Sequence, residues 1–300
     1  MKRYLALCFS ILLLGLTGCA TSNNWEVQVN KPLYYIENKE ALFEVQITEE
    51  SKPVVDLEID AEFSMANMDH GTYTLTLTEE ANGLYGGKIE LPMAGDWEIV
   101  LNINQNGKKL EKVLSYTVSE AKGVATINGE WITEEDLDFY RFINKLHIAI
   151  NRVEDEKTKK GQELDEALAH WDSQEKMNDD KNQLITQIIR LRSIAMLGLE
   201  KGHTASEDEI KAEINSVRDQ YERYEVATNM IKEYGDDKFW ETQEKQYKLI
   251  VLSQKVQFDV IEKVRKENPN VNEQEMMYLA QKQYEELLVS QVSSLEIELM

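Results

Sequence analysis

The spacing of apolar residues changes near residue 122 and divides the chain into two parts. Before that point, apolar and polar residues alternate with a period of two and many are β-branched or aromatic, which is typical of half-buried strands. The pattern predicts seven strands, at residues 25–29, 41–48, 57–64, 72–78, 84–91, 97–103 and 109–118. Seven short strands within residues 25–118 predict an immunoglobulin-like β-sandwich.

Two Asn-Gly pairs lie between predicted strands. Asn82-Gly83 and Asn106-Gly107 are suited to type I′ turns, because both central residues of that turn have a positive φ. The sequence lacks the Cys…Trp…Cys pattern of antibody domains, so the prediction is the sandwich architecture without its disulfide.

Residues 119–123 read as a linker, and beyond them the chain is helical in pattern. Thr133 with Asp136, and Ser206 with Glu209, have the spacing of capping boxes that begin helices. Amphipathic runs predict helices, and a charged stretch at 154–180 predicts a further surface helix. The runs cover residues 133–152, 180–201, 206–222, 236–265 and 272–299. Overall the chain is predicted to be α+β in separate domains, with an all-α domain at 124–300.

The N-terminus has the pattern of a secretory signal. Lys2 and Arg3 precede an apolar core that is too short to span a bilayer, which takes about 20 apolar residues. Leu16-Thr17-Gly18-Cys19 resembles the lipobox of bacterial lipoproteins. The resemblance implies a signal peptide at 1–18, a diacylated Cys19 that anchors the chain to a membrane outside the cytoplasm, and a tether at 19–24. The alternative is an ordinary signal with an unmodified cysteine.

Charge and cysteine content exclude several classes of function. Removing residues 1–18 takes away two basic residues and no acidic one, so a net charge of −22 becomes −24. Such a chain repels phosphate backbones and anionic lipid headgroups, so no nucleic-acid partner is expected and acyl chains must hold it to the membrane. Since Cys8 lies in the signal and Cys19 is lipidated, no disulfide or cysteine nucleophile remains.

The sequence predicts no enzyme site. It contains no Ser/His/Asp arrangement, paired-carboxylate signature, phosphate-binding glycine loop or zinc spacing. His147, His170 and His203 occur singly and are expected to be packing or surface residues.

One cluster offers metal chemistry. Met65, Met68 and His70 lie within six residues at the end of a predicted strand, and Met93 follows later. Thioethers and imidazole are ligands that Cu(I) prefers, so these four residues are the candidate metal site and Cu(I) the possible cofactor. The alternative is that the methionines fill gaps in a core and His70 occupies a turn.

The same region resembles the YtkA-like domains of the FixH superfamily. The resemblance covers residues 25–118 and rests on Lys52-Pro53-Val54, Met65 to Gly71, Gly83-Leu84-Tyr85 and Leu91-Pro92-Met93-Ala94-Gly95-Asp96-Trp97. It implies an extracytoplasmic immunoglobulin-like sandwich. Because some relatives occur beside proteins that handle copper or assemble cytochrome oxidase, it also implies that Met65, Met68, His70 and Met93 are the positions to test.

The helical part resembles the N-terminal domain of SurA-type chaperones and PrsA-type foldases. The resemblance covers residues 123–265 and rests on the segment from Val124 to Thr133, on 184–210 and on Tyr234 to Trp240. It implies binding of unfolded polypeptide by the helices between Thr133 and Val264. The acidic insertion at 154–180 departs from the family pattern, and the roughly 35 residues after 265 leave no room for an isomerase domain.

Two crowded apolar runs are candidate client surfaces or, alternatively, core. They are Phe139, Tyr140, Phe142 and Ile143, and Met276 to Leu279 with Tyr284, Leu287 and Leu288. The leading hypothesis is a membrane-anchored extracytoplasmic binding lipoprotein that assists folding or assembly of exported proteins without isomerase activity. The alternatives are a Cu(I)-binding protein for copper delivery or oxidase assembly, and a structural scaffold.

Overall fold

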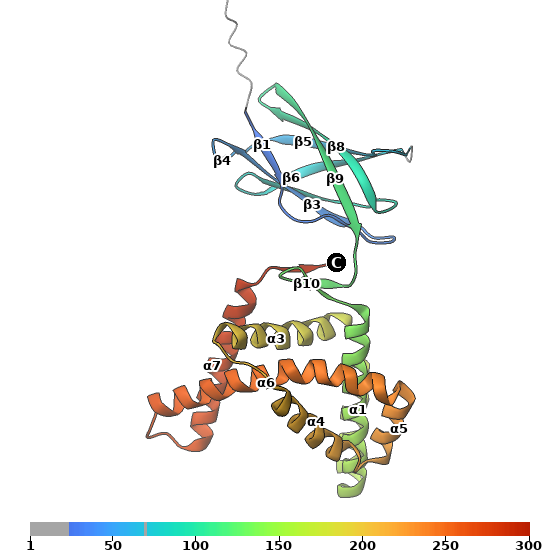
Figure 1. The fold of residues 1–300 in the computed structure, drawn as a ribbon, viewed down its shortest axis with the longest axis vertical. Coiled ribbons are helices and arrows are strands. Elements are labelled where there is room, and N and C mark those ends of the chain that lie inside the picture. Colours follow the sequence, from blue (N-terminus) through green and yellow to red (C-terminus); the bar gives the residue numbers. More distant parts are fainter. Residues whose placement is uncertain (1–23, 69–70) are drawn as a thin grey trace, which may run out of the picture. The chain divides into compact units, whose positions relative to one another are not determined.

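A computed structural model of the chain describes residues 24–68 and 71–300. The described residues form two compact units, one ending at Glu120 and the other spanning Ala121–Met300. The first is built of strands and the second mainly of helices (Figure 1). The division falls inside the predicted linker, although β-structure continues into it through Ser119 and Glu120.

The first unit contains a nine-stranded sheet. Its hydrogen-bonded order is β1-β3-β7-β6-β5-β8-β9-β2, and β4 pairs with β3. Every pair is antiparallel except β2 with β9. The strands are β1 (Glu26–Val29), β2 (Tyr34–Tyr35), β3 (Ala41–Glu49), β4 (Lys52–Pro53), β5 (Glu58–Met65), β6 (Thr72–Ala81), β7 (Leu84–Ile89), β8 (Gly95–Gln105) and β9 (Lys108–Glu120).

The sheet curls because β6 belongs to both of its halves. Residues 72–77 of β6 pair with β5, whereas 78–81 pair with β7. The two ends of the strand order, β1 and β2, are joined by residues 30–33, and the Leu33 N–H donates to the Tyr116 hydroxyl at 2.9 Å. The two separate sheets predicted for a sandwich are therefore two halves of one curled sheet.

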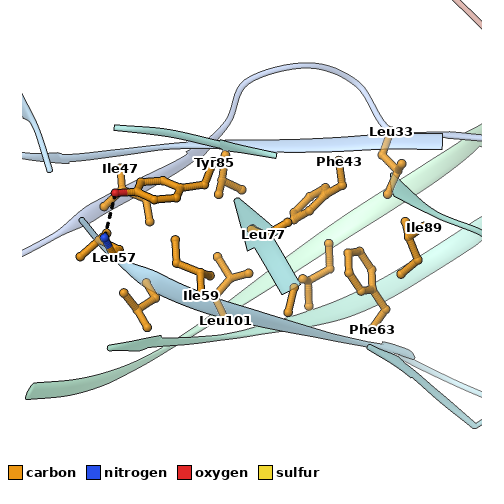
Figure 2. Packing of buried hydrophobic residues seen from close by; sticks show 14 of the residues in the cluster. Leu33, Phe43, Ile47, Leu57, Ile59, Phe63, Leu77, Tyr85, Ile89 and Leu101 are labelled. Atoms are coloured by element: carbon orange, nitrogen blue, oxygen red, sulfur yellow. Dashed lines mark hydrogen bonds between the residues drawn. The ribbon is translucent and has the colours of Figure 1, made fainter. Parts of the chain in front are cut away.

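The two halves enclose an apolar core. In Figure 2, Phe43 and Tyr85 on one half face Ile59 and Phe63 on the other. The rings of Phe43 and Phe63 meet edge to face with centroids 5.1 Å apart, a favourable aromatic geometry. The alternating residues that the sequence marks as apolar are the ones that supply this core.

One of the two Asn-Gly turns differs from its prediction. Asn106 and Gly107 both have positive φ, at 52° and 85°, as a type I′ turn requires. At the other turn only Gly83 has a positive φ, of 72°, and the pairing of β6 with β7 shifts register between Glu79 and Ala81. The extra residue of this bulge relieves Asn82 of the left-handed conformation, so the predicted type I′ turn there is wrong.

The second unit has seven helices and a small sheet among its residues. The helices are α1 (Glu134–Thr158), α2 (Gln162–Met177), α3 (Lys181–Glu200), α4 (Glu207–Tyr221), α5 (Glu225–Tyr234), α6 (Asp236–Glu267) and α7 (Glu273–Ser294). The charged stretch 154–180 contains the end of α1 and all of α2, which buries no residue completely. Helix α5 is not in the sequence prediction.

A small sheet completes the second unit, so the prediction of an all-α domain at 124–300 is wrong in this respect. Its strands are β10 (Ala125–Ile127), β11 (Glu130–Ile132) and β12 (Ile297–Leu299), in the order β11-β10-β12. The predicted helix at 272–299 is therefore wrong at its end, because α7 stops at Ser294 and the chain then pairs with β10. The Asn128 N–H donates to the Glu296 carbonyl oxygen at 2.7 Å, which stabilises this pairing.

Both predicted capping boxes are present. Thr133 and Asp136 begin α1, and Ser206 and Glu209 begin α4, with reciprocal hydrogen bonds at each site. Glu209 also forms an ion pair with Lys255 of α6, with the Lys255 Nζ and Glu209 Oε1 atoms 2.6 Å apart. The side-chain hydrogen bond from Lys255, followed by the bonds from Ser206, lowers the pKa of Glu209 to about 2.

We predict that Tyr85→Phe destabilises the sheet-rich unit without changing its fold. The Tyr85 hydroxyl donates to the Val54 carbonyl at 2.9 Å and accepts from the Leu57 N–H at 3.2 Å (Figure 2 shows the latter). Burial raises the pKa of Tyr85 to about 12. Removing the hydroxyl leaves two buried backbone groups unpaired, at a cost of about 1–3 kcal/mol, measurable by urea unfolding followed by tryptophan fluorescence. An unchanged midpoint would contradict this role.

We also predict that Glu209→Gln makes the helical unit less sensitive to acid. A carboxylate whose folded pKa lies near 2, against 4.5 normally, stabilises the fold above pH 4.5 and loses that effect as pH falls through 2. The gap in urea midpoint between the native chain and the variant, followed by circular dichroism at 222 nm, should be full at pH 7 and close toward pH 2. Asp208→Asn, in the same helical turn, controls for the helix dipole; an equal gap at all pH values would refute the assignment.

Candidate functional site

The structure brings Met65 close to the segment that carries Met93. Met65 ends β5, and its Cε would lie 2.8 Å from a Cβ placed on Gly95. The Ala66 N–H donates to the Asp96 carbonyl at 3.0 Å, which joins the end of β5 to the start of β8. Because Met93 lies two residues before Gly95, Met65 and the segment carrying Met93 are neighbours.

The other predicted residues are placed differently or not described. Met65 is half-buried and packs against the sheet core, whereas the Met68 side chain is 50% exposed. His70 and Cys19 lie outside the described residues. Within residues 24–68 and 71–300, no three His, Cys, Asp or Glu side chains are grouped so as to hold a metal ion.

The three histidines of the helical unit lie apart from one another. His147 Nε2 lies 2.9 Å from the Tyr221 hydroxyl, and His203 Nε2 lies 2.7 Å from Asp259 Oδ2. The His170 ring meets the Trp171 ring edge to face at 4.8 Å. Each histidine thus has a separate packing or hydrogen-bonding contact within its own surroundings.

The helical unit has a hollow of about 580 Å³, which we call the α3–α6 cleft. It lies among β11, the start of α1, the second half of α3 and the first half of α6. Its size is within the range of about 300–1,000 Å³ that ligand sites occupy. Its lining comprises Glu130, Trp131, Thr133, Glu135, Asp136, Arg192, Ala195, Met196, Leu199, Tyr234, Lys238, Thr242, Lys245, Gln246 and Leu249.

Apolar side chains form much of the α3–α6 cleft. Ala195 is fully buried beneath it, Met196 and Leu249 are half-buried, and Leu199 is 54% exposed. Acidic side chains come from β11 and the start of α1, whereas lysines come from α6. An apolar surface between charges of opposite sign suits an extended polypeptide, whose apolar side chains it can cover while its polar groups meet the rim.

Partly buried polar contacts hold the walls of the cleft together. Arg192 of α3 donates to the Trp131 carbonyl at 2.7 Å and to Asp136 Oδ2 at 2.8 Å. The Tyr140 hydroxyl of α1 donates to Gln246 Oε1 of α6 at 3.0 Å, and burial raises the pKa of Tyr140. These bonds link α3 and α6 to α1 and hold the cleft walls in place. They join polar atoms, so they do not cover the apolar side chains of the cleft.

A larger hollow, of about 780 Å³, lies among α4, α5 and α6 but is less suited to apolar side chains. The Arg218 guanidinium covers the Trp240 ring at 4.1 Å in a cation–π contact. Carboxylates including Asp236, Asp237 and Glu241 line it together with lysines and amides. Its main aromatic surface is thus already occupied.

The apolar runs named by the sequence are mostly core. Phe139 is 2% exposed, and Phe142 and Ile143 pack with it. In the second run Met276 is buried, whereas Met277 and Tyr278 are exposed. Two residues that line the α3–α6 cleft, Leu199 and Trp131, are not singled out by the sequence pattern. Leu199 falls at the end of the predicted helix 180–201, where nothing in the spacing separates an exposed leucine from a core one.

The geometry defines a class: a two-unit chain with a curled β-sheet unit followed by a helical unit that carries a cleft. Residues 20–102 match the family model described as YtkA-like, which confirms the resemblance in the sheet-rich unit. The match ends before the helical unit, whose resemblance to SurA stays a prediction. No helix among the described residues is long and apolar enough to cross a membrane.

Other comparisons add little. No curated protein matches the chain. One similar solved structure is the solution NMR structure of a lipoprotein from Bacteroides thetaiotaomicron, at 7% identity, with 33% of this chain and 82% of that chain covered and a TM-score of 0.20. Likeness at this TM-score says nothing about the fold or function of the present chain.

Proposed function

We propose that the chain is an extracytoplasmic lipoprotein, anchored through Cys19, whose helical unit binds unfolded segments of exported proteins. It assists their folding or assembly without isomerase or other enzymatic activity. The signal pattern and lipobox at residues 1–19 support the location. In this proposal the sheet-rich unit is an immunoglobulin-like domain of YtkA type and the helical unit is a SurA-like domain.

The observation that carries the proposal is the α3–α6 cleft. Leu199 is 54% exposed at its mouth, although the other apolar side chains of α3 are buried or half-buried. Lys238 and Lys245 on one side and Glu130 and Glu135 on the other supply polar contacts of both signs. An apolar surface with a mixed-charge rim can accept many unfolded segments, since it does not depend on one sequence.

We predict that Leu199→Asp weakens protection of an unfolding client. The soluble chain from residue 20 onward is mixed with a reduced, aggregating model protein, and light scattering is followed. A carboxylate at the mouth of the cleft opposes entry of apolar side chains, so about tenfold more variant should be needed for equal protection, or ~1.4 kcal/mol. Circular dichroism should show native helicity, because Leu199 is already exposed.

Val289→Asp is the matched control. Val289 is 63% exposed on α7 and does not line the cleft. It receives the same charge, so it should protect the client as the native chain does. Equal loss in both variants would show that total charge governs the effect, and no protection by the native chain at any salt concentration would refute the proposed function.

A second candidate function is Cu(I) binding for copper delivery or oxidase assembly. The observation that favours it is the close approach of the Met65 Cε to Gly95, two residues after Met93. Met65, Met68, His70 and Met93 would supply soft ligands of the kind that Cu(I) prefers. This function would use the sheet-rich unit and leave the α3–α6 cleft free.

We predict for this candidate that Met68→Leu abolishes Cu(I) binding with little change in thermal stability, because Met68 is 50% exposed. Cu(I) is titrated into the chain in competition with a chromophoric chelator, and the metal-to-protein ratio is recorded. Met177→Leu, at a methionine of α2 with 43% exposure, is the control and should bind as the native chain does. Unchanged affinity in Met68→Leu would exclude this site.

A further inference from the structure

Strand β9 has one open edge. It pairs with β8 along its length, from Gln105 opposite Lys108 to Gly95 opposite Val118. On its other side β2 covers only Ser119 and Glu120. Among the described residues no strand pairs with the remaining edge at 108–117. An edge of this length presents a row of backbone donors and acceptors to another chain.

The inward face of β9 is incompletely buried. Leu110, Leu114 and Tyr116 pack against the sheet core but stay partly exposed. Their direct partners on β8 are Ile103, Ile99 and Trp97, each at most 1% exposed. The core is thus complete up to β8 and incomplete at β9, because nothing in the described part of the chain covers the last strand. A further strand would bury this remaining apolar surface.

A lysine interrupts the inward row of β9. Lys112 lies between Leu110 and Leu114 on the same face, since side chains two residues apart share a face, and it pairs with the fully buried Leu101. Lys108 and Lys109 lie at the start of the strand. No ion pair joins these three lysines to any described residue. They form a local basic edge on a chain of net charge −22.

We propose that the open edge of β9 binds an extended segment of a partner polypeptide by strand addition, and that Lys112 selects segments with a carboxylate facing it. Backbone hydrogen bonds to residues 108–117 hold the segment, and its alternate apolar side chains cover Leu110 and Leu114. The carboxylate pairs with the Lys112 ammonium, which a purely apolar strand would leave desolvated and unpaired. This interaction is independent of the α3–α6 cleft.

The test uses the soluble chain from residue 20 onward and three labelled nine-residue peptides. The first carries Val, Glu and Val at alternate positions with Thr between them, so that these three side chains share one face. The second has Lys in place of Glu, and the third has the first composition in scrambled order. Fluorescence anisotropy should show binding of the first peptide only. Lys112→Glu should weaken that binding about tenfold and favour the lysine peptide instead. Lys88→Glu, at an exposed lysine of β7, should leave the affinities as in the native chain.

Hydrogen exchange locates the bound peptide. Amides of β9 should exchange more slowly in the complex, while those lining the α3–α6 cleft should not change. Slowing confined to α3 and α6 would overturn the proposal and assign the peptide to the cleft. Binding unaffected by Lys112→Glu, or no binding at all, would instead indicate that the lysines only guard the edge against aggregation. A dimer in sedimentation that Lys112→Glu dissociates would overturn it in favour of a second copy of this chain.

Discussion

The pairing of β10 with both β11 and β12 is the constraint on which the helical unit depends. It joins residues 125–127 to 297–299, the two ends of that unit in sequence. Ala125, Ile127 and Ile132 of this sheet are fully buried and pack with Leu184 and Ile188 of α3. The sheet thereby fixes β11 beside α3, and these elements form two walls of the α3–α6 cleft.

The sheet-rich unit is closed by a different means. Its strand order begins with β1 and ends with β2, and only residues 30–33 join these two strands. Such a covalent closure fixes the curl but supplies no backbone ladder along most of β9. The bond from Leu33 to Tyr116 fastens one end of the edge and leaves the remainder open. The same closure therefore explains why the core is complete up to β8, while the backbone groups along most of the β9 edge have no strand partner among the described residues.

The sequence predicts the elements that carry long periodic patterns and misses those that depend on distant partners. Seven strands and five helices follow from apolar spacing, as do the capping boxes at Thr133 and Ser206. Strands β2, β4, β10, β11 and β12 contain two or three residues, too few to show alternation. Strand β12 forms by pairing with β10, which lies about 170 residues earlier in the sequence. Site residues are harder still, since the exposure of Leu199 or Met68 depends on what the fold leaves uncovered.

Both candidate surfaces combine apolar groups with lysines on a chain that is otherwise strongly acidic. Lys238 and Lys245 lie at the α3–α6 cleft, and Lys112 lies at the β9 edge. For an acidic, partly apolar segment, the field of the whole chain opposes approach while the nearby lysines favour the bound state. Added salt screens the long-range repulsion over a Debye length of about 8–10 Å more than it screens a pair in contact. Selection among segments therefore rests on the local lysines and apolar surface, because the net charge of the chain repels all acidic segments alike.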